Sequence, residues 1–291
     1  MEKNIALVLS SGGARGYAHI GAIKVLERHG YTITSIAGTS MGAMVGGAYA
    51  TGRLAAFEHW LVSLDIREVL RLTDFSISPK GFVKGIKIIE KIKEIVPECF
   101  IEDLRIPYCA VATDIIKGEE SVFEEGSLYD AIRASISIPT VFQPQKIGEH
   151  YYVDGGIINP IPVNRVKRNK GDLLVVVDVN SPVPRQNRVG IPDNKEHEDH
   201  QEQINLIHSK INKLIPGKKA EELSIFNLSN KSIATMIRKI SELTLEKHQP
   251  DLLINISIES FNAYDFYKAK EIIREGELAT LDALNQLVTV T

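Results

Sequence analysis

Residues 5–16 read IALVLSSGGARG, and residues 33–42 read ITSIAGTSMG. Each stretch begins with a short run of β-branched and aliphatic residues and passes into a turn rich in glycine and serine. A helical pattern follows each turn, over about residues 17–29 and 43–50. Because strands that alternate with helices are typical of parallel sheets, these two stretches predict an α/β fold.

The rest of the chain continues this alternation. Further strands are predicted at about 107–113, 151–153, 172–179 and 252–258, and helices at about 54–64, 86–95, 128–135 and 264–287. The run DLLVVVDV at 172–179 is apolar almost throughout, as expected for a central strand. After Pro182 the composition changes, and the polar residues 185–203 predict a loop that leads into an amphipathic region at 204–248.

The composition excludes several classes of protein. The formal net charge of −3 over 291 residues lacks the basic footprint of a nucleic-acid-binding protein. Cys99 and Cys109 have no ligand-like spacing, which argues against a zinc site or a disulfide framework. The apolar run 5–9 is too short for a signal peptide, and the uncharged stretch 32–51 is rich in small residues rather than leucine. We therefore expect a cytoplasmic protein without a transmembrane helix.

The sequence GTSMG at 38–42 matches the G-x-S-x-G pattern of a nucleophile elbow. A sharp turn between a strand and a helix exposes the Ser40 hydroxyl, and the flanking glycines let backbone segments pass closely. The helix that begins there directs its amino-terminal amides and positive dipole end at the site. Although the pattern is common by chance, its position between a strand and a helix makes Ser40 the leading candidate nucleophile.

The sequence GGARG at 12–16 occupies the corresponding place after the first strand. Such a loop directs several backbone amides to one point, which suits a phosphate or the oxyanion of an acyl-transfer intermediate. A dinucleotide site is the competing interpretation, and it requires an acidic residue at the end of the second strand. Residues 36–38 there read IAG, so the oxyanion interpretation is favoured.

A third feature, Asp154-Gly155-Gly156, follows the predicted strand 151–153. Alone, an aspartate before two glycines predicts only a turn. Together, GGARG, GTSMG and DGG resemble in order and spacing the patatin-like phospholipases, in particular the bacterial members. The same family is matched by Ala134-Ser135 with Pro139, by Thr113-Asp114, by NPIP at 159–162 and by the segment 250–277. The resemblance covers about residues 5–280, with 185–203 matched least.

The resemblance implies an acyl hydrolase acting on phospholipids, lysophospholipids or neutral esters through a dyad. Ser40 would attack the ester carbonyl, and Asp154 would take its proton and return it to the leaving alcohol. Burial would make Asp154 a better base by raising its pKa. The implied oxyanion donors are the amides of Gly12, Gly13, Ala14 and Met41. Arg15 is expected to brace the loop, and the supporting glycines are Gly16, Gly38, Gly42, Gly155 and Gly156.

The resemblance also implies a single patatin-like domain over residues 1–291. Its three-layer α/β/α core, with a mostly parallel sheet, would span about 5–181, followed by the polar insert at 185–203. A C-terminal extension of helices and one late strand would span 204–287.

Two alternatives remain open. An α/β-hydrolase triad would recruit a histidine, and four candidates lie downstream of Ser40: His197, His200, His208 and His248. Against a triad, the nucleophile follows the second predicted strand, earlier than that fold normally allows. The other alternative is a non-catalytic regulatory or adaptor protein on the same scaffold. A scaffold, however, has no physical need for Ser40, Asp154 and the glycine loop together.

The remaining polar features have structural interpretations. His19 and His150 are expected in structural or surface roles, and HEDH at 197–200 is expected in a charged loop rather than a metal site. Residues 204–248, with Lys210, Lys213, Lys218 and Lys219, are interpreted either as helices packed on the sheet or as an interfacial lid in peripheral contact with anionic lipid. The expected partner is a lipid or other acyl ester substrate. No cofactor, metal or nucleic acid is expected, and the sequence does not indicate the oligomeric state.

Overall fold

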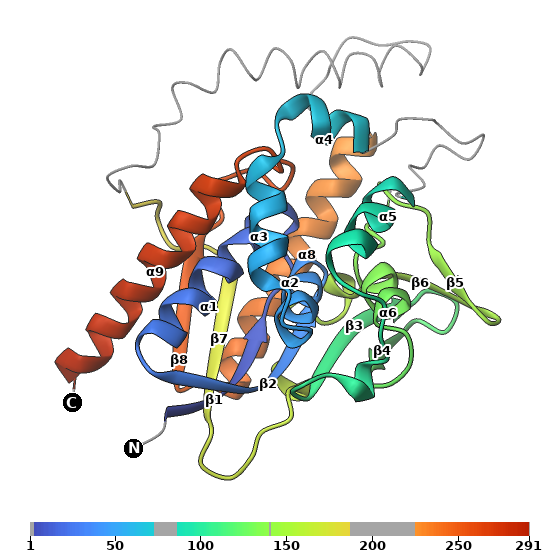
Figure 1. Ribbon diagram of the computed structural model, residues 1–291. Coiled ribbons are helices and arrows are strands. Elements are labelled where there is room, and N and C mark those ends of the chain that lie inside the picture. The colour runs from blue at the N-terminus through green and yellow to red at the C-terminus, as the bar shows by residue number, and fades with distance from the viewer. Residues whose placement is uncertain (1–2, 73–85, 140, 187–224, 291) are drawn as a thin grey trace.

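The computed structural model describes residues 3–72, 86–139, 141–186 and 225–290 (Figure 1). The strands are β1 (Lys3–Leu9), β2 (Tyr31–Thr39), β3 (Tyr108–Asp114), β4 (Glu119–Phe123), β5 (Gln145–Ile147), β6 (His150–Asp154), β7 (Leu173–Ser181) and β8 (Leu252–Ser257). The helices are α1 (Ala18–Arg28), α2 (Met41–Ala50), α3 (Leu54–Ser63), α4 (Ile66–Leu72), α5 (Ile86–Ile95), α6 (Leu128–Ser135), α8 (Ile225–His248) and α9 (Ala269–Val290). Short 3₁₀ turns are η1 (Gly13–Tyr17), η2 (Ile101–Asp103), η3 (Gly155–Ile157) and η4 (Val163–Arg165).

Within the described residues, eight strands form one sheet in the order β5-β6-β3-β2-β1-β7-β8, and β4 pairs with β3 outside this path. The five strands β3, β2, β1, β7 and β8 are paired in parallel, so their carboxyl ends lie along one edge, called here the carboxyl edge. Strands β4, β5 and β6 join by antiparallel pairing. The predicted α/β fold with a mostly parallel sheet is confirmed.

Alternating side chains of the central strands pack into two layers. In β1, Ile5, Leu7 and Leu9 join the larger core beneath helices α1, α2, α6 and α9, whereas Val8 faces the other way. Val8 belongs to a second cluster against which Leu245 of α8 packs. Figure 1 shows α8 crossing behind the sheet, with α1 and α9 side by side on the near face. Helices therefore cover both faces, as the period of two along a buried strand requires.

Several boundaries differ from the sequence predictions. Strands β4 and β5 and helix α4 were not predicted, because each is short and only partly buried, so its hydrophobic pattern is weak. The predicted closing helices at 264–287 are one helix, α9, which begins only at Ala269. The first helix is preceded by the turn η1, so the GGARG loop is itself partly helical.

Parts of the C-terminal predictions lie outside the described residues. These parts are residues 187–203 of the polar insert, with the HEDH sequence, and residues 204–224 of the amphipathic region, with its four lysines. Among the residues that the structure does describe, no helix is both long enough and apolar enough to span a bilayer.

Candidate active site

Ser40 occupies a strained turn between β2 and α2. Its backbone angles are φ 55° and ψ −121°, in a region that side-chain-bearing residues rarely adopt. A Cβ on Gly42 would lie 2.2 Å from the carbonyl oxygen of Leu9, and one on Gly38 would lie 2.5 Å from the backbone of Gly42 and Ala43. The two flanking glycines of the motif are therefore required by close backbone packing, and the predicted sharp turn between a strand and a helix is present.

The edge of β3 brings Ser40 and Asp154 together across 114 positions of sequence. The pairing of β2 with β3 ends at Thr39 and Val111. The next residue of β3, Ala112, pairs with Asp154 of β6. β4 occupies the other edge of β3 over this stretch, so β2 and β6 share one edge. β2 pairs with this edge of β3 only as far as Thr39, and β6 pairs with the same edge from Asp154 onward. Asp154 therefore lies next to Ser40, which follows Thr39.

The Ser40 hydroxyl donates a hydrogen bond of 2.5 Å to Oδ2 of Asp154. Both side chains are nearly inaccessible, with exposed fractions of 3% for Ser40 and 6% for Asp154. The amide of Gly156 donates to Oδ1 of Asp154 at 2.8 Å and so fixes the carboxylate plane. Burial raises the pKa of Asp154 from 3.8 to about 6, although the hydrogen bonds from Ser40 and Gly156 oppose the rise. The carboxylate is therefore a stronger base than an exposed aspartate.

A second serine, Ser135, is hydrogen-bonded to the backbone of Ser40. The Ser135 hydroxyl, at the end of α6, accepts from the Ser40 amide at 2.8 Å and donates to the Val111 carbonyl at 2.6 Å. A Cβ on Gly155 would lie 2.1 Å from that same carbonyl oxygen, so the turn after Asp154 packs against it. The Val111 carbonyl is thus contacted both by Ser135, which holds the Ser40 backbone, and by the turn that follows Asp154.

The GGARG loop lies beside the elbow, because β1 and β2 are neighbouring parallel strands. Gly13 has φ 58°, which favours glycine, and the amide of Ala14 donates to the Ala263 carbonyl at 2.9 Å. This bond engages one predicted oxyanion donor, Ala14. The amides of Gly12, Gly13 and Met41 have no hydrogen-bond acceptor among the described residues. Gly12 and Gly13 are also partly exposed.

Arg15 contacts neither Ser40 nor Asp154 but the end of β7 and the segment after β8. Its guanidinium donates to Oδ1 of Asn180 at 2.7 and 3.1 Å and to the carbonyl of Phe261 at 3.3 Å. The Asn180 amide group in turn donates to the Ser11 carbonyl at 2.5 Å. Burial lowers the pKa of Arg15 to about 10, so the side chain stays cationic at neutral pH. These contacts fasten the glycine loop to the end of β7 and to the segment after β8.

A family model of patatin-like phospholipases matches residues 7–166, which is more than half of the chain. The chain belongs to the patatin-like phospholipase family. The matched region contains the elbow, the glycine loop and the Asp154 turn, the three motifs on which the resemblance was based.

Relatives with similar sequences are longer proteins. An uncharacterized NTE family protein of Mycobacterium bovis is 49% identical over 176 residues, which are 60% of this chain and 49% of the relative. A lysophospholipase of Debaryomyces hansenii is 34% identical over 188 residues, 62% of this chain and 12% of that protein. The chain thus spans about half of the length of the first relative and a much smaller share of the second.

One solved structure, VipD from Legionella pneumophila, covers 98% of this chain and 67% of its own, at 16% identity and a TM-score of 0.48. That similarity is too low to bear on the geometry of the site.

None of the described histidines is hydrogen-bonded to Ser40 or to Asp154. Nε2 of the buried His19 lies 2.9 Å from the Ser10 carbonyl oxygen, and burial lowers the pKa of His19 to about 4, so its ring is neutral. Nδ1 of His150 lies 2.7 Å from Oδ2 of Asp114. His248 ends α8 just before β8 starts, at the edge of the sheet opposite Ser40. The other three triad candidates, His197, His200 and His208, lie outside the described residues.

The sequence did not predict the roles of Ser135 and Asn180. Ser135 was noted only as part of a family pattern, and nothing local links it to the Ser40 amide 95 positions away. Asn180 follows the strongest predicted strand, and a polar residue at the carboxyl end of such a strand was the one available signal.

Proposed function

We propose that this protein hydrolyses carboxylic esters of lipids, with Ser40 as nucleophile and Asp154 as general base. The observation that carries the proposal is the 2.5 Å hydrogen bond between two buried side chains, a hydroxyl and a carboxylate of raised pKa. A buried carboxylate that is aimed at a strained serine has no evident structural purpose. Membership of the patatin-like phospholipase family supports the lipid class of substrate.

In the first half-reaction, the Ser40 oxygen forms a bond to the ester carbonyl carbon while its proton passes to Oδ2 of Asp154. The carbonyl oxygen becomes an oxyanion. When the tetrahedral intermediate collapses, the alcohol leaves with the proton from Asp154, and an acyl-Ser40 ester remains. In the second half-reaction, Asp154 takes a proton from water as the water oxygen attacks the acyl carbonyl carbon. When this second tetrahedral intermediate collapses, the bond to the Ser40 oxygen breaks, that oxygen takes the proton back from Asp154, and the fatty acid is released.

The oxyanion would be bound by the amides of Gly12, Gly13 and Met41. These three amides have no acceptor among the described residues, whereas those of Ala14 and Ser40 are engaged with Ala263 and Ser135. Met41 is also the first residue of α2, so the positive end of the helix dipole faces the developing charge. A single donor of this kind is typically worth about 3 kcal/mol of the barrier.

The peripheral membrane contact predicted through 204–248 stays a prediction. Its described part, α8, exposes Leu228, Met236 and Leu243. The two interpretations of this region are a lid on anionic lipid and helices packed on the sheet. Both also involve residues 204–224, which lie outside the described residues.

The decisive experiment is hydrolysis of a short-chain chromogenic ester by the protein and by its Ser40→Ala and Asp154→Asn variants. Turnover should fall by about 10⁴-fold or more in Ser40→Ala, because no other described hydroxyl is bonded to Asp154. His→Gln changes at positions 197, 200, 208 and 248 should leave turnover intact.

Each alternative predicts a different result. A loss comparable to that of Ser40→Ala in one histidine variant would instead support a triad. No turnover of short-chain or lipid esters would favour the regulatory or adaptor role, and equal turnover by Ser40→Ala would exclude Ser40 as the nucleophile.

A further inference from the structure

The turn between β3 and β4 exposes two adjacent isoleucines. Ile115 is 50% and Ile116 is 69% exposed, although tight turns usually carry glycine, asparagine, aspartate or proline. The turn is well ordered by Asp114, whose Oδ1 accepts from the amides of Ile116 and Lys117 at 3.0 and 3.2 Å. Two large aliphatic side chains are therefore held in water by a rigid turn, a placement that folding alone does not explain.

The neighbouring strands extend this apolar tip into a row. The Ile115 amide donates to the Tyr151 carbonyl of β6 at 2.9 Å, and Tyr151 pairs with Lys146 of β5. Because residues directly opposite each other on antiparallel strands share a face, Ile115, Tyr151 and Lys146 lie in line. Tyr151 is 40% exposed, and the Lys146 ammonium lies 5.6 Å from its ring centre. We call Ile115, Ile116, Tyr151 and Lys146 the edge row.

The edge row lies close to the dyad. Tyr151 precedes Asp154 by three residues on β6, which is about 10 Å along a strand. β3 continues past the level of Thr39 toward the same tip, so the edge row lies farther out at the carboxyl edge. Because side chains alternate along β6, Tyr151 and Asp154 lie on opposite faces of the sheet. In Figure 1 the β5–β6 hairpin extends from the right side of the molecule, on the side away from α9.

We infer that the edge row is a docking surface for a phospholipid bilayer. Aliphatic side chains at a rigid tip can enter the acyl region, a tyrosine ring suits the interface, and lysines suit lipid phosphates. Lys117 and Lys146 flank the isoleucines, but Glu119 and Glu149 are exposed nearby as well. Apolar insertion therefore supplies most of the affinity, and anionic lipid adds a smaller, salt-sensitive part.

The test is co-sedimentation with vesicles of phosphatidylcholine, without and with added phosphatidylglycerol, in the Ser40→Ala background so that no lipid is consumed. The Ile115→Ser/Ile116→Ser double change should lower the partition coefficient at least about tenfold on both vesicle types. Two matched controls also remove exposed aliphatic side chains: Leu173→Ser at the start of β7, on the opposite edge, and Met236→Ser on α8. Each control should bind within about twofold of the parent.

The inference would be overturned if the parent did not bind vesicles or if the double variant bound as well as the parent. It would also be overturned by an equal loss in Leu173→Ser or by a loss in Met236→Ser alone. The last result would assign the contact to α8. The protein could instead sediment in the absence of lipid because it self-associates. If that self-association depended on the two isoleucines, the tip would be assigned to contact with a second copy of the chain, and the bilayer inference would be wrong.

The choice of a bilayer as the partner rests on the proposed function, because that function makes the substrate a lipid. Bilayer binding is nevertheless measured without turnover, so the hydrolase proposal and the docking inference can fail separately. Vesicle binding without hydrolysis of any ester would count against the hydrolase alone. Hydrolysis of a soluble ester without vesicle binding would count against the edge row alone. With Ser40 intact, the isoleucine double variant should hydrolyse a soluble ester at the parental rate and show the parental melting temperature.

Discussion

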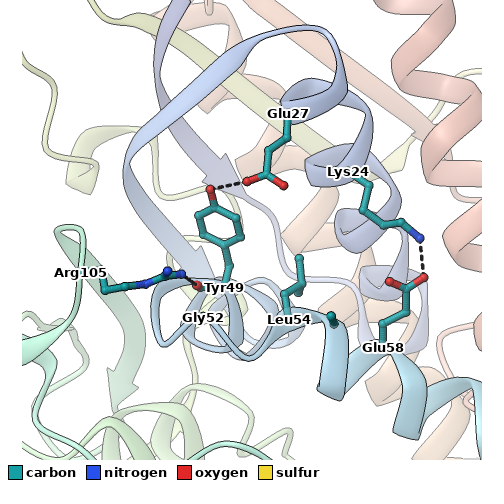
Figure 2. Close-up of a pocket in the computed structure, with 8 residues that line it drawn as sticks. Lys24, Glu27, Tyr49, Gly52, Leu54, Glu58 and Arg105 are labelled. Atoms are coloured by element: carbon teal, nitrogen blue, oxygen red, sulfur yellow. Dashed lines mark hydrogen bonds and ion pairs between the residues drawn. The ribbon is translucent and has the colours of Figure 1, made fainter.

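The polar groups at the two ends of helix α2 differ in whether they have hydrogen-bond or ion-pair partners. At the amino end, Ser40 has a strained backbone, and the Met41 amide has no acceptor among the described residues. At the carboxyl end lies a hollow of about 280 Å³ whose charged groups already have partners (Figure 2). There, Tyr49 donates to Glu27 at 2.8 Å, Lys24 to Glu58 at 2.6 Å, and Arg105 to the Tyr49 carbonyl at 3.3 Å.

This difference shows that empty volume alone does not identify a reactive site. The Arg105 cation complements the negative end of the α2 dipole, as the ends of helices generally require. The amino end instead has amides without acceptors among the described residues, beside a buried carboxylate, and these amides would gain a partner if negative charge developed on a bound group there. Strain and unused donors, rather than a hollow, distinguish the end of the helix at which we propose the reaction.

The largest difference between the two ends is expected from glycine substitutions. In Gly42→Ala the new Cβ would lie 2.2 Å from the backbone oxygen of Leu9, and relief requires a backbone shift at the elbow. We expect a loss of about 3 kcal/mol or more in unfolding free energy, together with loss of turnover. In Gly52→Ala the nearest atoms, at 2.9 Å, belong to the flexible end of Arg105, so only the positive φ of 76° costs about 1–2 kcal/mol. Denaturant unfolding and ester turnover measure both, and equal losses would contradict the comparison.

Asp154 should destabilise the fold in its charged form. Its pKa of about 6 in the folded state exceeds the value of 3.8 expected when unfolded, so its contribution to stability is present below pH 4 and is lost as pH rises through 6. At pH 8 the free energy of unfolding of Asp154→Asn should therefore exceed that of the parent by up to about 3 kcal/mol, and this difference should vanish near pH 4. Its turnover should be absent, and parental turnover should rise with pH through about 6.

A matched control for Asp154 is Asp178→Asn. Burial raises the pKa of Asp178 to about 6 as well, so this variant should gain stability over the same pH range and keep its turnover. A parental rate that is flat from pH 8 to pH 4 would contradict the assignment of Asp154 as the base.

The smallest expected effects come from the hydrogen bonds that hold each end. Ser135→Ala leaves the buried Ser40 amide and the Val111 carbonyl without their partner, at a cost of about 1–3 kcal/mol in stability. Since the nucleophile is then less well positioned, kcat should fall about 10- to 100-fold with little change in KM. Arg105→Ala should cost about 1 kcal/mol or less and leave kcat unchanged. A larger kcat loss in Arg105→Ala than in Ser135→Ala would reverse the expected order.

Local sequence pattern was sufficient to predict β1, β2, α2, β3, α6 and β7 within a few residues. Each is a contiguous apolar run or helical pattern bounded by glycine or by a polar turn, so its signal lies within its own residues. β5 has only three residues, and β4 has five that are at most partly buried, so neither carries such a signal. The start of α9 was misplaced, because Asp265 closes a turn by accepting from the Asn262 amide at 3.0 Å, and the helix begins only afterwards.

The sequence by itself determined the chemical groups of the candidate site and the turns that present them. GTSMG specifies a turn too tight for side chains at its ends, and GGARG specifies a loop with accessible amides, because both are consequences of missing Cβ atoms. Only the tertiary structure decided that Ser40 meets Asp154, that Ser135 supports Ser40, and that Ala14 is bonded to Ala263. These contacts join residues about 95 to 250 positions apart, and they depend on which strand occupies each stretch of the β3 edge and on how the segment after β8 folds back over the loop. Pairing and packing of that kind are set by the whole sheet at once, so no local pattern records them.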